Sequence, residues 1–144
     1  MKTIALRFAE YFAPPEGTIR AHEEVISRVG YVWYGKMGTP LSHKVIETIL
    51  EQESPRILLI HSGGTERYWA YVDDISRETP EEPKYPDYYH DKSDKFKTWF
   101  KVNHFELAPR GIMAECVVAS SGSVLSDASK RSMSPYFIII APDD

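Results

Sequence analysis

The chain has 144 residues, of which 42% are hydrophobic and 26% are charged, a composition that suits one folded domain and excludes extensive disorder. The formal net charge of −4 argues against a protein that coats DNA by electrostatic attraction alone. No apolar run approaches a membrane span, and Arg7 interrupts the stretch in which a signal peptide needs continuous apolar residues. We therefore expect a single domain, residues 1–144, in a cytoplasmic protein without membrane contact.

The first 35 residues predict a strand, a helix and a second strand. Residues 3–8 alternate in polarity, which is typical of a half-buried strand. Residues 18–29 carry apolar side chains at helical spacing, and Gly30 follows as a usual residue at a helix C-terminus. Residues 31–34 are β-branched and aromatic, so they predict the next strand.

A second helix and a hairpin are predicted next. Ser42 is a favourable N-cap, and the residues after it place an apolar stripe on one helix face. Residues 56–61 form a continuous apolar run, which indicates a buried strand. The two glycines at 63–64 then turn the chain, and residues 68–72 return as the following strand.

The second half of the chain predicts strands joined by loops. Residues 78–94 are polar and rich in proline and tyrosine, which indicates a long excursion outside the core. Further strands are predicted at 97–105, 114–119 and 136–141, with a serine-rich loop at 120–134. Because the two helices come early and the strands then follow one another, we expect an α+β fold. Its mixed, largely antiparallel, curved sheet would close toward a barrel with two main helices packed on its ends.

Signatures of catalysis and of metal binding are missing from the sequence. There is no P-loop, no dinucleotide-binding fingerprint and no nucleophile elbow, and the histidines and the single cysteine lack metal-ligand spacing. We therefore predict no catalytic residue, no metal and no cofactor, and a binding protein in preference to an enzyme. Two alternatives stay open: a small enzyme or small-molecule binder that uses Asp73, His104 or Cys116, and a protein-interaction subunit that uses the loop at 78–94.

Aromatic residues gather within the predicted strands. Trp33, Trp69 and Trp99 each lie in such a strand with aromatic neighbours, Tyr34 among them. Period-two alternation allows each strand to send one aromatic set to a pocket, where a nucleobase stacks with about 1–3 kcal/mol per base. The same rings fit a hydrophobic core equally well.

Charge is unevenly distributed along the chain, since residues 73–91 carry seven acids and two bases whereas residues 92–131 carry seven bases and four acids. That pattern suits either an ordinary solvated surface or a basic face that meets phosphate.

The order of these elements resembles the PUA-like barrels, especially their EVE and YTH-like branch. The resemblance lies in the strand at 67–75 (RYWAYVDDI), the tyrosine-rich excursion, the strand at 97–102 (KTWFKV) and the terminal strand after Ser134-Pro135. Members of that branch bind nucleic acids, and several take a modified base into an aromatic pocket. The Gly-x-Lys-x-x-Glu-x-Arg motif of the related ASCH domains is absent, so the resemblance implies no nuclease-like role.

The resemblance implies a nucleic-acid-binding module that reads a base, including a modified one. The residues implied to form the base pocket are Trp33, Trp69, Trp99 and Tyr34. Hydroxyl groups for a base edge or a phosphate would come from Ser120 and Ser121. Contacts to the nucleic-acid backbone would come from Lys97, Lys101, Lys130 and Arg131. The implied partner is nucleic acid, and a reader without an attached effector domain would also need an effector protein to produce an outcome.

Overall fold

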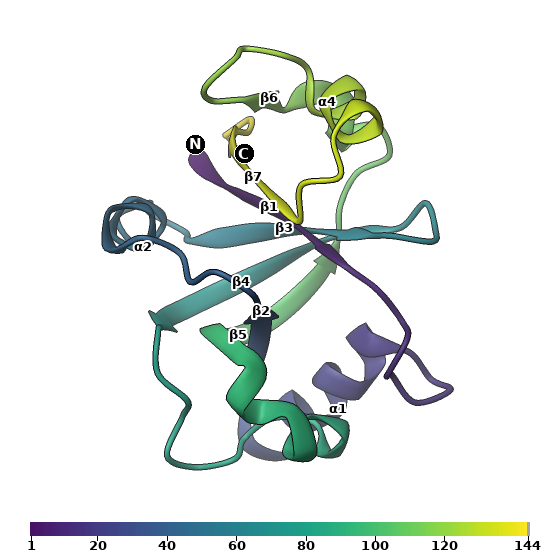
Figure 1. The fold of residues 1–144 in the computed structure, drawn as a ribbon, viewed down its shortest axis with the longest axis vertical. Coiled ribbons are helices and arrows are strands. Elements are labelled where there is room, and N and C mark those ends of the chain that lie inside the picture. The colour runs from purple at the N-terminus through teal and green to yellow at the C-terminus, as the bar shows by residue number, and fades with distance from the viewer. Residues whose placement is uncertain (144) are drawn as a thin grey trace.

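Seven strands pair into one curved sheet in the order β2-β5-β4-β3-β1-β7-β6 (Figure 1). The structure, a computed structural model, describes residues 1–143, and Asp144 lies outside the described part. The strands are β1 (Lys2–Phe8), β2 (Val32–Met37), β3 (Arg56–His61), β4 (Arg67–Ser76), β5 (Phe96–Leu107), β6 (Val117–Val118) and β7 (Tyr136–Ile140). The sheet is mixed and mostly antiparallel, as predicted, because β1 and β3 are its one parallel pair within residues 1–143.

Five helices accompany the sheet within residues 1–143, where the sequence predicted two main ones. They are α1 (Thr18–Val29), α2 (His43–Leu50), the 3-10 helix η1 (Asp87–Lys95), α3 (Ile112–Glu115) and α4 (Leu125–Arg131). Local signals set the ends of the two predicted helices. Gly30 ends α1 in the left-handed conformation with φ of 91°, and the Ser42 side chain accepts a hydrogen bond from the Val45 N–H at 3.2 Å.

The predicted closure of the sheet into a barrel is not supported, because no hydrogen bonds join its two edge strands, β2 and β6. Each edge is occupied by a nearby segment instead. The Trp33 N–H of β2 donates to the Lys84 carbonyl at 2.8 Å, and Val117 of β6 forms a bridge with Val124. Each edge strand thus has a partner within the chain other than the opposite edge strand.

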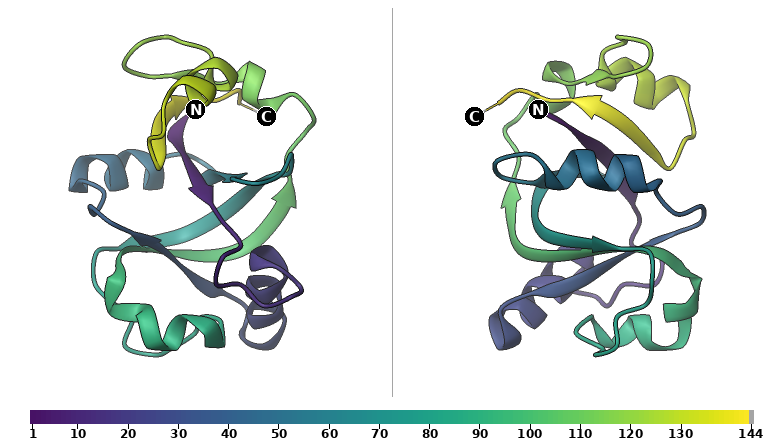
Figure 2. Two further views of the ribbon diagram at one scale, coloured as in Figure 1. Left: turned by 45° about the vertical axis from the view of Figure 1, so that its right-hand side comes forward. Right: turned by 90° about the vertical axis from the view of Figure 1, so that its left-hand side faces the viewer.

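Alternation along the strands divides the interior into two main cores. Ile4, Leu6 and Phe8 of β1 face the first core, which the curved sheet shares with α1 and α2. Ala5, between them, faces the second core, which α3 and α4 cover from the other side of the sheet. Figure 2 shows α4 and both termini at one end of the molecule and α1 and η1 at the other.

A third, smaller core forms where the excursion at 78–94 folds back on the outer face of β5. Phe96 and Trp99 of β5 are buried there beneath Tyr89, with Tyr85 and Tyr88 packed around them. Ring centroids lie 4.4 Å apart for Tyr89 and Phe96 and 5.3 Å apart for Tyr85 and Trp99. The tyrosines of the excursion thus pack as a satellite cluster and do not present an exposed contact patch.

One predicted element differs in kind. The strand expected at 114–119 is a short helix, α3, followed by the two-residue strand β6. Gly111 has a φ of 87°, a left-handed conformation that starts α3 and that an L side chain rarely adopts. None of the helices in residues 1–143 combines the length and the apolar character that crossing a membrane requires.

Candidate functional site

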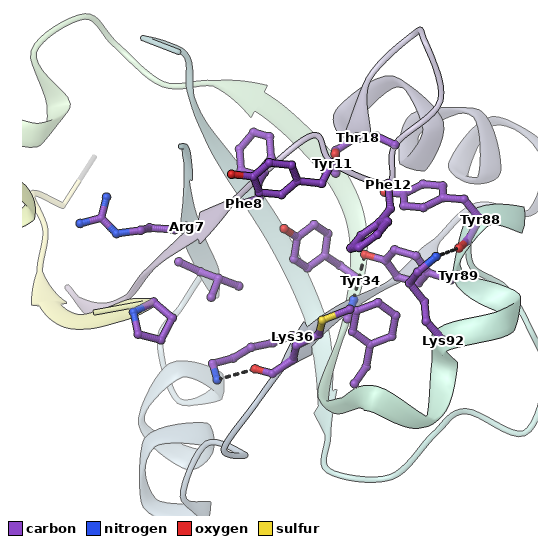
Figure 3. A pocket seen from close by; sticks show the side chains of 17 residues that line it. Arg7, Phe8, Tyr11, Phe12, Thr18, Tyr34, Lys36, Tyr88, Tyr89 and Lys92 are labelled. Atoms are coloured by element: carbon purple, nitrogen blue, oxygen red, sulfur yellow. Dashed lines mark hydrogen bonds between the residues drawn. The ribbon is translucent and has the colours of Figure 1, made fainter. Parts of the chain in front are cut away.

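A hollow of about 260 Å³ opens between the end of β1, the loop at 9–17, β2 and η1 (Figure 3). We call it the aromatic pocket, because aromatic rings from β1, the loop at 9–17, β2, η1 and β5 line it. The aromatic residues that line it are Phe8, Tyr11, Phe12, Tyr34, Tyr88, Tyr89 and Phe96. Its charged lining residues are the cations Arg7, Lys36 and Lys92, and no carboxylate of the described chain lines it.

The loop at 9–17 carries Tyr11 and Phe12 and is fixed at its base. Both carboxylate oxygens of Glu10 accept the Thr18 N–H, at 3.2 and 3.3 Å, and so cap the first turn of α1. Within the loop, the Ala13 N–H donates to the Glu10 carbonyl at 3.2 Å. The loop therefore projects its two aromatic residues from an anchored base, and both are exposed.

The opposite wall comes from β2. Tyr34 points into the first core and is buried, with its phenol end at the pocket (Figure 3). Gly35 allows Phe96 to lie directly against the strand, since a Cβ at position 35 would come 2.5 Å from the Phe96 Cγ. The Gly35 N–H also donates to the Tyr89 hydroxyl at 3.3 Å, which ties η1 to β2.

Beneath the pocket, His22 of α1 joins this wall in a buried chain of hydrogen bonds. Its Nδ1 lies 2.8 Å from the Thr18 carbonyl, which can only accept, so Nδ1 carries the proton. Its Nε2 therefore accepts the Tyr89 hydroxyl proton at 3.1 Å. Burial lowers the pKa of His22 to about 4, against a weaker upward effect of the Thr18 carbonyl, and the neutral ring satisfies the network.

The Tyr34 hydroxyl is the polar group of this wall that remains open to a ligand. No hydrogen bond to it is formed by any residue from 1 to 143, whereas the neighbouring Tyr89 hydroxyl is fully engaged. Burial is the main cause that raises the pKa of the Tyr34 phenol well above its ordinary value. The phenol therefore keeps its proton and can both donate and accept.

Arg7 gives the pocket positive charge on its other side. The Arg7 guanidinium holds the segment after α4, since Nε donates to the Ser134 carbonyl at 2.9 Å and Nη2 donates to the carbonyls of Ser129 and Ser132 at 2.7 and 2.9 Å. Its Nη1 makes no hydrogen bond within the described chain. Because all three acceptors are neutral carbonyls, the charge of Arg7 is not cancelled.

Lys36 is a buried cation without a carboxylate partner among residues 1–143. Its Nζ donates to the carbonyls of Met37 and Thr39, at 3.2 and 2.8 Å, and lies 4.9 Å from the ring centroid of Tyr136. Burial lowers the pKa of the Lys36 ammonium. Lys92, the third lining cation, pairs with Asp91 at 3.2 Å and lies 4.8 Å from the ring centroid of Phe12.

The three tryptophans predicted to share one open hollow are not brought together. Trp69 is 1% exposed in the second core, with the Arg56 guanidinium 4.1 Å from its ring centroid. Trp99 is completely buried in the third core beneath the excursion, and Trp33 is half-buried beside it. The three tryptophans therefore do not converge on one hollow, contrary to the prediction. The reason is that α3, α4 and the folded excursion cover the strand faces on which Trp69 and Trp99 lie.

The other predicted site residues are dispersed. Tyr34 alone among them lines the aromatic pocket. Ser120 borders a separate hollow beside β7, and Ser121 follows it in the β6–α4 connection.

The residues predicted to contact the nucleic-acid backbone lie on β5 and α4. On β5, the Lys97 ammonium donates to the Asp94 carbonyl, and the Lys101 ammonium lies 4.5 Å from the Tyr31 ring centroid. Lys130 and Arg131 end α4 and are exposed, next to the carbonyls that hold Arg7. Their roles toward a ligand stay predictions.

The residues of the enzyme alternative lie in different environments. Cys116 is buried in the second core, and burial raises the pKa of its thiol to about 11, so it is a poor nucleophile at neutral pH. Asp73 is exposed on β4 and accepts from the Asn103 amide at 2.8 Å, while His104 is exposed on β5. Within residues 1–143, no three histidine, cysteine or acidic side chains gather to hold a metal ion.

Alternation along strands does not point to Tyr11 and Phe12, because both lie between β1 and α1 and outside every strand. Both precede Pro14-Pro15 in a stretch that breaks secondary structure. Large aromatic residues within such a loop cannot all enter the core, so they are a usable sign of a binding surface.

The sequence profile of the Pua-like family matches residues 4–133, which is most of the chain and includes every residue that lines the aromatic pocket except Pro135. Searches of curated proteins and of solved structures gave no significant match. The mixed, mostly antiparallel sheet with its flanking helices agrees with the predicted α+β class, but not with the predicted closure into a barrel. The chain belongs to the Pua-like family.

Proposed function

We propose that the chain is a nucleic-acid-binding module that takes one base of a strand into the aromatic pocket. The observation that carries the proposal is the combination of seven aromatic residues around one hollow with three lining cations and no lining carboxylate. Family membership agrees with it, since the Pua-like family is associated with RNA binding. The proposed base site is therefore the aromatic pocket and not the buried tryptophans.

Each part of the pocket has a separate task in this proposal. Aromatic faces stack a planar base at about 1–3 kcal/mol per base without regard to its sequence. The Tyr34 hydroxyl, without a partner in the described chain, meets the polar edge of the base. The charges of Arg7 and Lys36 attract the phosphate backbone, and the exposed Lys130 and Arg131 extend that attraction along α4.

A modified base is compatible with the same pocket, as the resemblance to the EVE and YTH-like branch implies. The pocket is lined mainly by rings and apolar groups. A methyl group added to a base would be buried against these rings, and one such group is worth about 1–3 kcal/mol in a fitted apolar pocket. We propose that methylated bases bind more tightly than the parent base.

Binding of a labelled single-stranded oligonucleotide, measured by fluorescence anisotropy at fixed salt, tests the proposal. Phe12→Ala should weaken binding about 5- to 150-fold, because it removes one stacking face worth about 1–3 kcal/mol. Tyr34→Phe removes only the hydroxyl and should weaken binding about 2- to 10-fold through one lost hydrogen bond.

Leu107→Ala is the matched control, since Leu107 is as exposed as Phe12 (64% against 63%) and lies outside the pocket. Its affinity should equal that of the unaltered protein, and circular dichroism should show all three variants folded. Equal affinities for Phe12→Ala, Tyr34→Phe and Leu107→Ala would refute the pocket as the base site.

A further inference from the structure

Tyr11 is the most exposed of the aromatic residues that line the aromatic pocket. It is 89% exposed, whereas Tyr34 and Tyr89 are buried and Tyr88 is half-buried. Figure 3 shows its ring beside Phe8, carried by the same loop as Phe12. The base of that loop is held by the hydrogen bonds between Glu10 and Thr18 described above.

A strand with one base in the pocket must leave its neighbouring bases outside. Sugar and phosphate join consecutive bases closely, with about 3.4 Å of rise per base when they are stacked. A neighbour of the seated base therefore emerges at the rim, where it loses stacking on the base that has been withdrawn. An exposed aromatic face at the rim can replace that lost stacking.

We infer that Tyr11 is a stacking platform for the base adjacent to the seated one, so that the protein recognises a short single-stranded segment and not an isolated nucleotide. This inference rests on the proposed function. A polyanionic strand, and not an apolar protein partner, fits the rim because the lining charges of the adjoining pocket are all positive. The platform acts through the ring face, so the phenol hydroxyl of Tyr11 contributes little.

The inference is tested with trinucleotides that carry A, C, G or U at the centre, each made with intact flanking bases and again with abasic flanks. The two forms carry the same phosphates, so their affinity ratio isolates stacking of the flanking bases. By isothermal titration calorimetry, the unaltered protein should bind the intact form about 5- to 150-fold more tightly. Tyr11→Ser should reduce this ratio to near one, and Tyr11→Phe should keep it.

The possible results distinguish failure of Tyr11 as a stacking platform from failure of the aromatic pocket as the base site. A ratio near one for the unaltered protein, with abasic-flanked ligands still weakened by Tyr34→Phe, would overturn the platform and leave the proposed function standing. Equal weakening of intact and abasic-flanked ligands by Tyr11→Ser would also overturn it, because Tyr11 would then cover the seated base itself. Absence of binding to every trinucleotide would overturn both.

Discussion

Replacing Trp69 by alanine should lower the free energy of unfolding by about 3–5 kcal/mol, the usual cost of removing a large buried ring. Trp69 is 1% exposed in the second core, and its ring also packs under the Arg56 guanidinium. It does not line the aromatic pocket, so the folded variant should bind oligonucleotides as the unaltered protein does. Urea denaturation followed by circular dichroism measures the first quantity, and anisotropy at a temperature where the variant is folded measures the second.

Trp33→Ala serves as the control for the size of the removed ring. Trp33 is half-buried at the edge strand β2, so its removal should cost less than that of Trp69. A Trp69→Ala variant that is nearly as stable as the unaltered protein but no longer binds would reinstate the indole as a ligand contact. It would contradict the placement of Trp69 in a sealed core.

The stability of the protein should fall by about 3 kcal/mol as the pH decreases from 7 to 4, through His22 alone. The pKa of His22 is about 4 in the folded chain, against its ordinary value of 6.5. Between these values the unfolded chain binds more protons at His22 than the folded chain does. Acidification therefore favours unfolding, by about 1.4 kcal/mol for each unit of pKa difference.

Urea denaturation at several pH values, compared between variants, isolates this contribution from that of the carboxylates. His22→Gln should be less stable at pH 7 but should show a shallower dependence of stability on pH. His104→Gln, which alters an exposed histidine, should keep the full dependence. An unchanged pH dependence in His22→Gln would mean that His22 is not held neutral beneath the pocket.

Features of the fold that depend on neighbouring residues could be predicted from the sequence. Gly30 and Ser42 set helix ends through their own backbone and side-chain chemistry, and the apolar run at 56–61 matches β3 residue for residue. The hairpin turn at 63–64 joins the antiparallel strands β3 and β4, as expected. Such signals act over a few residues, so a single sequence contains them.

Features that depend on distant segments could not be predicted in this way. Whether a strand face is open or covered is decided by what packs on it, and Trp99 is covered by an excursion that lies before β5 in the chain. At the edge of β2, the Trp33 N–H donates to the Lys84 carbonyl of the same excursion, a contact that the strand order did not indicate. A polar, proline-rich composition did not reveal that this segment folds back on the sheet.

The residues of the candidate site also divide into those that a local sequence signal indicates and those that depend on distant segments. Tyr34 was predicted because it lies in an aromatic strand, and the structure places it in the pocket wall. Its partners in the pocket come from the loop at 9–17 and from η1, which are 22 and 54 residues away from it at Phe12 and Tyr88. Alternation within a strand carries no information on such pairs, so the sequence pointed to tryptophans, whereas tyrosines and phenylalanines line the hollow.

A crystal structure of the protein with a bound trinucleotide tests the central claim most directly. The central base should lie in the hollow enclosed by Phe12, Tyr34 and Tyr89, with one polar edge atom about 2.5–3.2 Å from the Tyr34 hydroxyl oxygen. A trinucleotide bound elsewhere on the surface, with this hollow unfilled, would contradict it.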